Sequence, residues 1–276
     1  MKKRDIRILK TVILPLLALL FVSPLLWMVS SSLKPASEVF ATPFHLIPET
    51  VKWSNYFTVW TDDTVSMIQA YFNTFKIVII ATFGQIVIAS MAAYAFAKVD
   101  FRGKNIIFLL FLSSMMIPTQ VTIIPRFMLF KTMNLYNTHW SIILPTLFGA
   151  TSIFMLRQFY MGLPNDLIEA AKIDGASMFQ RILHIDIPEL VPMIVLQLIM
   201  SVGNLMNVGF EKVLLLQTEL NKATSDIIAV YVYEQGIINA KYSYSTAVGL
   251  FNTVVNIILL IIVNRIAKKA ADVSFV

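Results

Sequence analysis

Six long apolar runs constrain this chain more than any other feature of its sequence. Each run is long enough to cross the hydrocarbon core of a bilayer as a helix, which takes about 20 apolar residues. The runs lie at about 11–29, 72–96, 106–130, 140–159, 190–210 and 243–263. Hydrophobic residues make up 57% of the chain and charged residues only 14%, with a mean hydropathy of +0.74, which excludes an ordinary soluble domain. We therefore expect an all-α integral membrane protein with six transmembrane helices.

The first run follows a basic leader, MKKRDIRILK. A secretory signal peptide begins in the same way, but this run is long for the apolar part of a signal, and no clean small-x-small cleavage site follows it. We therefore predict a retained span, so that residues 1–32 form a cytoplasmic leader and the first transmembrane helix.

The third run carries Pro118 and Pro125, which should kink it. A break of this kind frees backbone carbonyls, and a membrane tolerates it only where protein or water satisfies them. We expect the broken part of this run to meet that condition.

The distribution of Lys and Arg predicts the orientation of the chain. The leader, the turn at 98–104, the polar segment after the fourth run and the tail are rich in basic residues, whereas acidic residues offset the fewer basic ones of the opposite loops. Because excess Lys and Arg mark cytoplasmic loops, both termini are expected inside, and the net charge of +6 needs no nucleic-acid partner. This orientation gives an extracellular segment at 33–70, a core domain at 71–264 with a cytoplasmic loop at 160–192, and a cytoplasmic tail at 265–276.

The segment Leu163–Pro192 is a long polar interruption in this apolar sequence. Pro164 and Asn165 suit a helix start, and the run LIEAAKID that follows consists of good helix formers. Gly175 is free to adopt a left-handed conformation and end that helix. The segment is therefore predicted to begin with a short helix that ends at a glycine.

A second short helix is expected next, with the sequence MFQRILHID. Ser177 and Gln180 have the spacing of a capping box at its start, and the helix should stop near Pro188. One of its faces carries Phe179, Ile182 and Leu183. The segment is thus predicted to be a helix–Gly–helix finger with an apolar side. Such a finger could lie on the lipid surface or on its own bundle, or it could dock on another protein.

The residues of this finger resemble the EAA motif of binding-protein-dependent ABC importers. The matching positions are Glu169, Ala170, Ala171, Asp174, Gly175 and Ala176, with Ser177, Gln180, Ile185, Pro188 and Pro192 after them. In that family the finger is the coupling helix that docks in a groove of the cytoplasmic ATPase. The resemblance implies that the docking residues are Glu169, Ala170, Ala171, Asp174, Gly175, Ala176 and Phe179.

The chain as a whole is similar to a carbohydrate-type permease subunit of the maltose-permease kind. The resemblance implies the type I ABC importer permease fold, with both termini inside, in the cytoplasmic (inner) membrane of a bacterium. It also implies a heterodimer with a second homologous permease, two ABC ATPase subunits that bind ATP and Mg, an extracellular solute-binding protein, and an oligosaccharide as the substrate. No cofactor is expected on this chain.

Nothing in the sequence points to an enzyme. The chain lacks the GxxxxGK phosphate-binding loop that ends in Ser or Thr, so ATP hydrolysis is expected on a partner. It contains no Cys, and its three His residues show no metal-ligand spacing. The spans almost lack ionisable residues, which ion-coupled carriers usually place there. An ion-coupled secondary carrier is nevertheless the alternative from a different class.

Polar residues recur at helical spacing in the last two runs, and they are the candidate lining of a transport path. Helical geometry puts each set on one face, and polar groups are costly in lipid, so both faces should point into the bundle. The alternative role is hydrogen bonding that holds helices together. The candidates are Gln197, Ser201, Asn204 and Asn207 in the fifth run, and Asn252 and Asn256 in the sixth.

The C-terminal third refines the resemblance. Segments such as NVGFEKVLLLQ and SDIIAVYVYEQG, and HIDIP in the finger, are similar to the branch that handles complex oligosaccharides and polysaccharide fragments. The Trp-Asn-rich stretch of the maltose type is replaced here by NLMNVGF, so no sugar-contacting residue is carried over. We expect the permease subunit of an oligosaccharide importer. A permease for a polyol or a glycerol phosphate ester is the alternative within the class.

Overall fold

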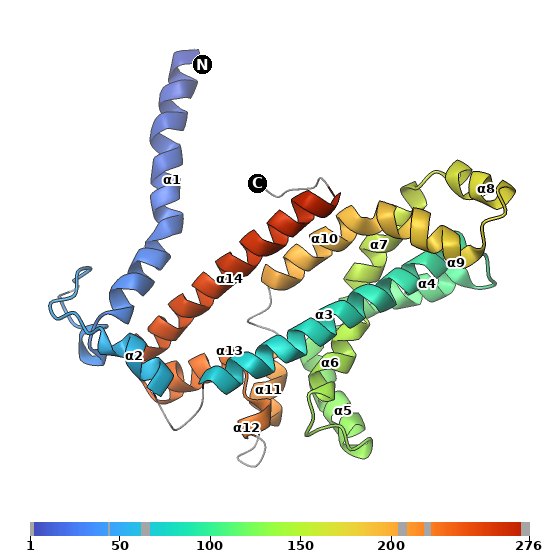
Figure 1. Ribbon diagram of the computed structural model, residues 1–276. Helices are drawn as coiled ribbons and strands as arrows, with labels where there is room; N and C mark the ends of the chain where they lie inside the picture. Colours follow the sequence, from blue (N-terminus) through green and yellow to red (C-terminus); the bar gives the residue numbers. More distant parts are fainter. Residues whose placement is uncertain (1–2, 44, 62–66, 204–208, 218–221, 272–276) are drawn as a thin grey trace. The chain divides into compact units, whose positions relative to one another are not determined.

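The computed structural model describes residues 3–43, 45–61, 67–203, 209–217 and 222–271, and each regular element in these ranges is a helix (Figure 1). The chain divides into two compact units. Unit 1 consists of residues 1–68 and 230–255, and unit 2 consists of residues 69–229 and 256–276. Apolar side chains are buried in both units.

Unit 1 combines the beginning of the chain with a part near its end. Its elements are α1 (Lys3–Ser32), the 3₁₀ helix η1 (Ala36–Glu38), α2 (Ser54–Thr61), most of α13 (Ile228–Tyr233), the π-helix η5 (Glu234–Ile238) and the first half of α14 (Tyr242–Ala271). Gly236 in η5 permits a close approach to α14, because a Cβ at this position would lie 2.4 Å from the Ser245 hydroxyl. That hydroxyl donates to the Val232 carbonyl at 2.8 Å.

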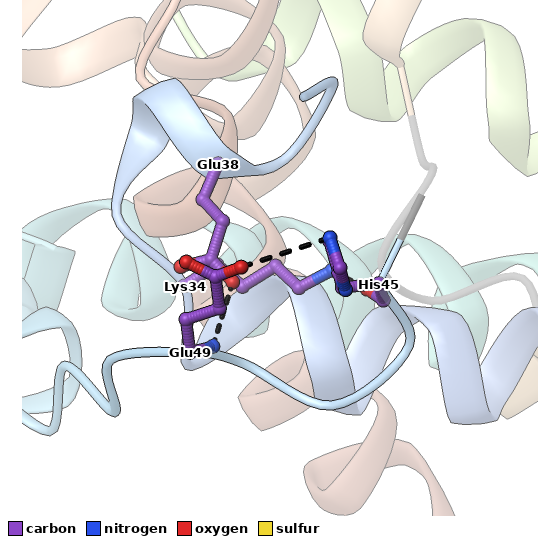
Figure 2. Close-up of polar contacts among 4 residues, drawn as sticks. All are labelled: Lys34, Glu38, His45 and Glu49. Atoms are coloured by element: carbon purple, nitrogen blue, oxygen red, sulfur yellow. Dashed lines mark hydrogen bonds and ion pairs between the residues drawn. The ribbon is translucent and has the colours of Figure 1, made fainter. Parts of the chain in front are cut away.

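Polar contacts hold the segment that follows α1. Lys34 is only 1% exposed; its ammonium lies 5.2 Å from the Trp27 ring centroid and donates to the His45 carbonyl. The His45 ring lies 3.6 Å from the Glu49 carboxylate, and the Glu49 backbone N–H donates to Glu38 at 2.8 Å (Figure 2). These contacts fold the segment back onto the end of α1.

Helix α2 is tied to the same end of α1. The side-chain amide of Asn55 donates to the carbonyls of Ser32 at 2.8 Å and Lys34 at 3.1 Å. The hydroxyls of Ser32 and Tyr56 are 2.7 Å apart and share a hydrogen bond. The last carbonyls of a helix have no donor within the helix, and the buried Asn55 side chain supplies a donor to the Ser32 carbonyl at this end of α1.

Unit 2 contains the middle of the chain. Its elements are nearly all of α3 (Met67–Lys98), α4 (Lys104–Ser113), the 3₁₀ helix η2 (Ser114–Met116), α5 (Thr119–Thr132), α6 (Trp140–Leu147), α7 (Ala150–Gly162), α8 (Asn165–Ile173), α9 (Met178–Arg181), the π-helix η3 (Ile182–Asp186), α10 (Ile187–Gly203), α11 (Phe210–Leu216) and α12 (Lys222–Ser225). The second half of α14 also belongs to this unit.

The buried core of unit 2 forms where three long helices meet. Ala89 and Ala93 of α3 are fully buried and allow α7 and α10 to pack closely. The larger side chains in this cluster are Ile153, Leu156 and Tyr160 of α7, and Leu190 and Met193 of α10. Because α7 and α10 are fixed here, the polar segment that connects them starts and ends on a rigid base.

The predicted number of spans is confirmed if one bent pair of helices counts as a single span. Among the described residues, five helices are long and apolar enough to cross a membrane: Thr11–Ser32, Met67–Lys98, Trp140–Gly162, Met178–Ser201 and Tyr242–Ile266. The pair Lys104–Met116 and Thr119–Thr132 bends by 104° and accounts for the third predicted span.

The bend in the third span is much sharper than a kink, and Pro118 explains its position. Ile117 has an extended backbone, with φ −84° and ψ 116°, as is usual for a residue that precedes proline. Pro118 then stands immediately before α5. Pro125 lies inside α5 and does not end it. Only one of the two prolines therefore breaks the span.

Candidate functional site

The candidate site is the finger Leu163–Pro192, which connects α7 to α10 within unit 2. Figure 1 shows α8 and α9 at the ends of these two helices. The finger consists of α8, a turn at Gly175, the short helix α9, the π-helix η3 and the start of α10. The predicted helix–Gly–helix arrangement is therefore present.

Helix α8 begins and ends where the sequence predicts. Pro164 is its N-cap, and Asp166 lies in the first turn, where the helix dipole favours a negative charge. At the other end Gly175 has φ +78°. Its N–H donates to the Lys172 carbonyl at 3.1 Å, and the Ala176 N–H donates to the Ala171 carbonyl at 2.9 Å. This pair of bonds is a Schellman motif, which satisfies the last carbonyls of the helix.

The predicted capping box at Ser177 is confirmed. The Ser177 hydroxyl accepts from the Gln180 N–H at 3.3 Å, and the Gln180 side chain accepts from the Ser177 N–H at 2.8 Å. Each residue thus satisfies a backbone donor of the other. The turn between α8 and α9 is fixed by contacts within a few residues of sequence.

The predicted stop near Pro188 is wrong. Residues Met178–Ser201 form a single helical span of 24 residues that passes through this proline. The reason is the π-helix Ile182–Asp186, which immediately precedes α10. In a regular α-helix the Pro188 ring would clash with the carbonyl of His184. The wider turn moves that carbonyl and removes the need for the N–H that proline lacks.

The apolar side chains of the finger are largely uncovered. Ile173 is 86% exposed and Phe179 is 73% exposed. Other exposed apolar residues on the finger are Leu167, Met178 and Leu183, whereas Ile182 of the predicted face is half-buried. A cluster of exposed apolar side chains on a defined turn is typical of a protein interaction site.

The residues predicted to dock on the ATPase all lie on this finger. Glu169 and Ala170 are exposed on α8, and Ala171 is half-buried beside them. Asp174, Gly175 and Ala176 form the turn, and Phe179 follows on α9. The fold therefore brings these seven residues together, while their role in docking remains a prediction.

Two basic side chains for which the sequence predicted no structural contact lie at the base of the finger. The Lys98 ammonium donates to the Leu163 carbonyl at 3.1 Å, at the point where the finger begins. Arg157 donates to the Phe96 carbonyl at 3.2 Å and lies 4.1 Å from the Phe108 ring centroid. The position of Lys98 in the last turn of α3 is the sequence signal for such a role.

Asp186 at the end of η3 is a further buried residue that the sequence analysis missed. Its side chain is 1% exposed, and its Oδ1 atom has no hydrogen-bond partner in the described part of the chain. Lys98 and Arg181 are the cations close enough to act on it electrostatically. An acidic residue in an otherwise apolar stretch, HIDIP, is the signal that could have identified it. No group of residues suited to a metal ion occurs in the described ranges.

The predicted lining of the transport path is only partly described. Gln197 and Ser201 are half-buried on α10, and Asn252 and Asn256 are half-buried on α14. The amide oxygen of Asn256 is buried and has no hydrogen-bond partner among the described residues. Asn204 and Asn207 lie outside the described residues. Both roles considered for these side chains, lining a path and holding helices together, stay predictions.

A family model decides the identity of the chain. The model of binding-protein-dependent transport system inner membrane components matches residues 85–272, which include the whole finger. This chain belongs to that family. The resemblance stated from the finger motif is thereby confirmed, and the chain is a multi-pass component of the inner membrane.

Individual relatives agree with this assignment. The arabinooligosaccharides transport system permease protein AraQ of Bacillus subtilis is 32% identical over 204 residues, which is 72% of each chain. The sn-glycerol-3-phosphate transport system permease protein UgpE of Yersinia enterocolitica is 31% identical over 156 residues, or 55% of this chain and 56% of that protein.

The fold is also found in a solved transporter. A chain of a bacterial alginate ABC transporter, in complex with its alginate pentasaccharide-bound periplasmic protein, matches with a TM-score of 0.79 at 19% identity. The match covers 99% of this chain and 97% of that one. At this identity the likeness establishes the fold, and it confirms the predicted ABC importer permease architecture.

Proposed function

We propose that this chain is one of two permease subunits in an ATP-driven importer of oligosaccharides, and that the finger Leu163–Pro192 couples it to an ATPase. The observation that carries the proposal is the contrast within the finger: its backbone groups are capped locally, while Ile173 and Phe179 are left largely exposed. A surface of this kind is ready to enter an apolar groove without refolding, and a rigid interface loses little entropy on binding.

Two features suit the finger to transmitting motion: an exposed docking surface and an unbroken connection to the packed spans. Ile173 and Phe179 would enter the ATPase groove, and Glu169, exposed on α8, would pair with a basic residue at its edge. The finger continues through η3 into α10 without a break, and α10 packs on α7 and α3. A displacement of the ATPase would therefore move the packed spans as a body rather than bend a loop.

The remaining partners follow from the family and from its solved relative. Binding-protein-dependent transport requires a solute-binding protein outside, and the alginate transporter was solved with such a protein bound. The proposed complex contains a second, similar permease and two ATPase subunits that bind ATP and Mg. This chain supplies half of the membrane pathway.

The substrate class is proposed from the relatives. The AraQ relative is a permease for arabinooligosaccharides, and it matches 72% of this chain. A glycerol phosphate ester is the second candidate, because the UgpE relative serves sn-glycerol-3-phosphate. The polar residues Gln197, Ser201, Asn252 and Asn256 would offer amides and hydroxyls to either solute.

Transport by the reconstituted complex tests this function. The co-purified permeases, ATPase and solute-binding protein are placed in proteoliposomes, and uptake of labelled arabinotriose, trigalacturonate and glycerol 3-phosphate is measured. We expect ATP-dependent uptake of an oligosaccharide that survives an ionophore. Uptake that needs no ATP and is abolished by the ionophore would identify an ion-coupled carrier instead. ATP-dependent uptake of glycerol 3-phosphate alone would select the second candidate.

The orientation with both termini and the finger inside is part of the same proposal, because an ATPase reaches only the cytoplasmic face. Single cysteines can be placed at Ser37, Ser177 and Ser225 of this Cys-free chain. We expect a membrane-impermeant thiol reagent, added to intact cells, to label positions 37 and 225 but not 177. Labelling of position 177 from outside would contradict the orientation.

A further inference from the structure

A cavity of about 380 Å³ lies within unit 2, away from the finger. Its walls come from α3, from the connection between α5 and α6, from α6 itself, from α11 with the residue that follows it, and from the end of α12. The proposed orientation puts these segments on the outer side, where a binding protein would deliver its solute. The volume is within the range of small-ligand sites, about 300–1,000 Å³.

The charge of the cavity has one sign. Lys76 of α3 and Lys212 of α11 both line it, and its described lining contains no Asp or Glu. Neither lysine makes a hydrogen bond or an ion pair with a described residue. The adjacent carboxylate, Glu211, lines a different hollow and accepts two hydrogen bonds from Gln120 at 3.2 and 3.3 Å. The cavity thus holds positive charge that no neighbouring acid of its described wall balances.

Lys212 is the more informative of the two lysines. Burial lowers the pKa of its ammonium below the ordinary value, the Arg126 guanidinium lowers it further, and Glu211 acts in the opposite direction. Lys212 is half-buried, and a desolvated cation without an ion-pair partner in the described part of the chain is costly. An anion bound in the cavity would offset that cost, because its charge would replace the lost hydration of the ammonium.

The rest of the lining suits a sugar ring. The side-chain amide nitrogen of Gln217 is buried and has no hydrogen-bond partner in the described ranges, so it is a donor in need of an acceptor. Trp140 and Tyr136 also line the cavity and remain partly exposed. Aromatic rings offer flat apolar faces, and the cations and the amide offer donors, which together match a ring that carries a carboxylate.

We propose that this cavity binds a uronic acid unit of an oligosaccharide, with its carboxylate on Lys76 and Lys212, its ring against Trp140 and an oxygen on the Gln217 amide. The proposal rests on the proposed function and narrows its substrate class from oligosaccharides in general to anionic ones. A phosphate group shares the charge of a carboxylate, so a glycerol phosphate or an anionic lipid headgroup is the competing occupant.

Binding to the whole complex tests the site. The complex of both permeases and the ATPase, in phosphatidylcholine nanodiscs, is titrated with trigalacturonate and with the uncharged trisaccharide obtained by reducing its carboxyl groups. Lys212→Gln and Lys76→Gln remove one charge each, and Lys212→Arg keeps it. Lys131→Gln is the matched control, because Lys131 is exposed on α5 and does not line the cavity. Co-purification of the partner subunits reports assembly of each variant.

We expect each Gln variant to raise the Kd of trigalacturonate about tenfold or more, as the loss of a hydrogen bond to a charged group implies. The affinity for the uncharged trisaccharide should be the same in every variant. The Lys212→Arg variant and the Lys131→Gln control should bind trigalacturonate with the parental affinity. Lys76 is exposed, so its variant reports on the site even if Lys212→Gln fails to assemble.

Three results would overturn the site. Equal affinity of the parental complex for the charged and uncharged trisaccharides removes the basis for an anionic ligand. Glycerol 3-phosphate that competes as well as trigalacturonate assigns the cavity to phosphate. Loss of trigalacturonate binding when phosphatidylglycerol is added assigns it to a lipid headgroup. In each of these three cases, ATP-driven uptake of a neutral oligosaccharide would still support the proposed function. Absence of any oligosaccharide uptake would refute that function separately.

Discussion

Two polar segments of this chain connect membrane spans, and they treat their side chains in opposite ways. The segment after α1 turns polar groups inward: Lys34 and Asn55 are buried, and their donors satisfy backbone carbonyls. The finger in unit 2 satisfies its backbone through caps and turns apolar groups outward, with Ile173 86% exposed and Phe179 73% exposed. The first arrangement is closed on itself, and the second is open to a partner.

The direction of the side chains indicates whether a change in either segment acts on stability or on function. A buried polar group is expensive to leave unpaired, so changes in the segment after α1 should act on folding. An exposed apolar group adds little to folding but can contribute strongly to an interface. Changes in the finger should therefore act on assembly with the ATPase while the fold persists.

The largest effect is expected from Asn55→Leu. This change removes the donor to the carbonyls of Ser32 and Lys34 and leaves both acceptors buried. We expect a loss of about 2–6 kcal/mol of unfolding free energy, since the two acceptors cost about 1–3 kcal/mol each when they are left unsatisfied. Thermal unfolding of the purified protein in detergent measures it.

The control for that change is Asn239→Leu. Asn239 is exposed in the same unit, and its side chain makes no hydrogen bond with a described residue. Its variant should unfold at the parental temperature. If Asn55→Leu is as stable as Asn239→Leu, the segment after α1 is not held by this network.

The next largest effect is expected in the finger. Phe179→Ser should leave thermal unfolding unchanged, because the ring is 73% exposed. It should weaken the affinity for the ATPase about 30-fold, the loss of about 2 kcal/mol that is typical of an aromatic anchor in an interface. Phe57 of α2 is a matched control with the same 73% exposure. Equal ATPase affinity in the Phe179→Ser and Phe57→Ser complexes would show that the finger does not dock through its aromatic side chain.

The two regions also differ in how far the sequence predicts them. The caps of the finger follow from short spacings: Ser177 and Gln180 are three residues apart, and Gly175 ends α8 through bonds to carbonyls within five residues. Contacts this local depend on the chemistry of neighbouring residues, which the sequence displays directly. The helix start at Pro164 was predictable for the same reason.

Contacts between distant residues were not predictable. Lys34 meets the His45 carbonyl, and Asn55 lies 23 residues from Ser32. The lysines of the proposed anion site, Lys76 and Lys212, are farther apart still. No periodicity in the sequence encodes such pairs. The π-helix before Pro188 was missed for another reason: proline normally ends a helix, and the wide turn that accommodates it has no simple sequence signal.

A third prediction tests whether the finger needs its bend. Gly175 has φ +78°, and a Cβ at this position would meet no atom within 4 Å. The cost of Gly175→Val is therefore one of backbone conformation alone, about 1–2 kcal/mol. We expect normal membrane insertion with reduced ATPase association and uptake. Gly162 has the same open surroundings without a positive φ, so Gly162→Val should have no such effect. Full uptake by Gly175→Val would show that the left-handed turn is dispensable.

The smallest effect tests whether the caps pre-organise the docking surface. Ser177→Ala removes the acceptor for the Gln180 N–H and should cost about 1 kcal/mol of local helix stability. The reciprocal bond means that Gln180→Ala removes the other half of the capping box. The double variant should therefore lose less local stability than the sum of the two single losses.

Hydrogen exchange at residues 177–181 measures local stability, and ATPase affinity measures docking. We expect both to fall together by up to about fivefold, the factor that corresponds to about 1 kcal/mol. The control is Ser23→Ala, because the Ser23 hydroxyl donates to the Leu20 carbonyl one turn away on α1, outside the finger. Faster exchange with unchanged ATPase affinity would mean that the ATPase orders the finger on binding. The caps would then not pre-organise the docking surface, and of the two segments only the one after α1 would be fixed by its own contacts.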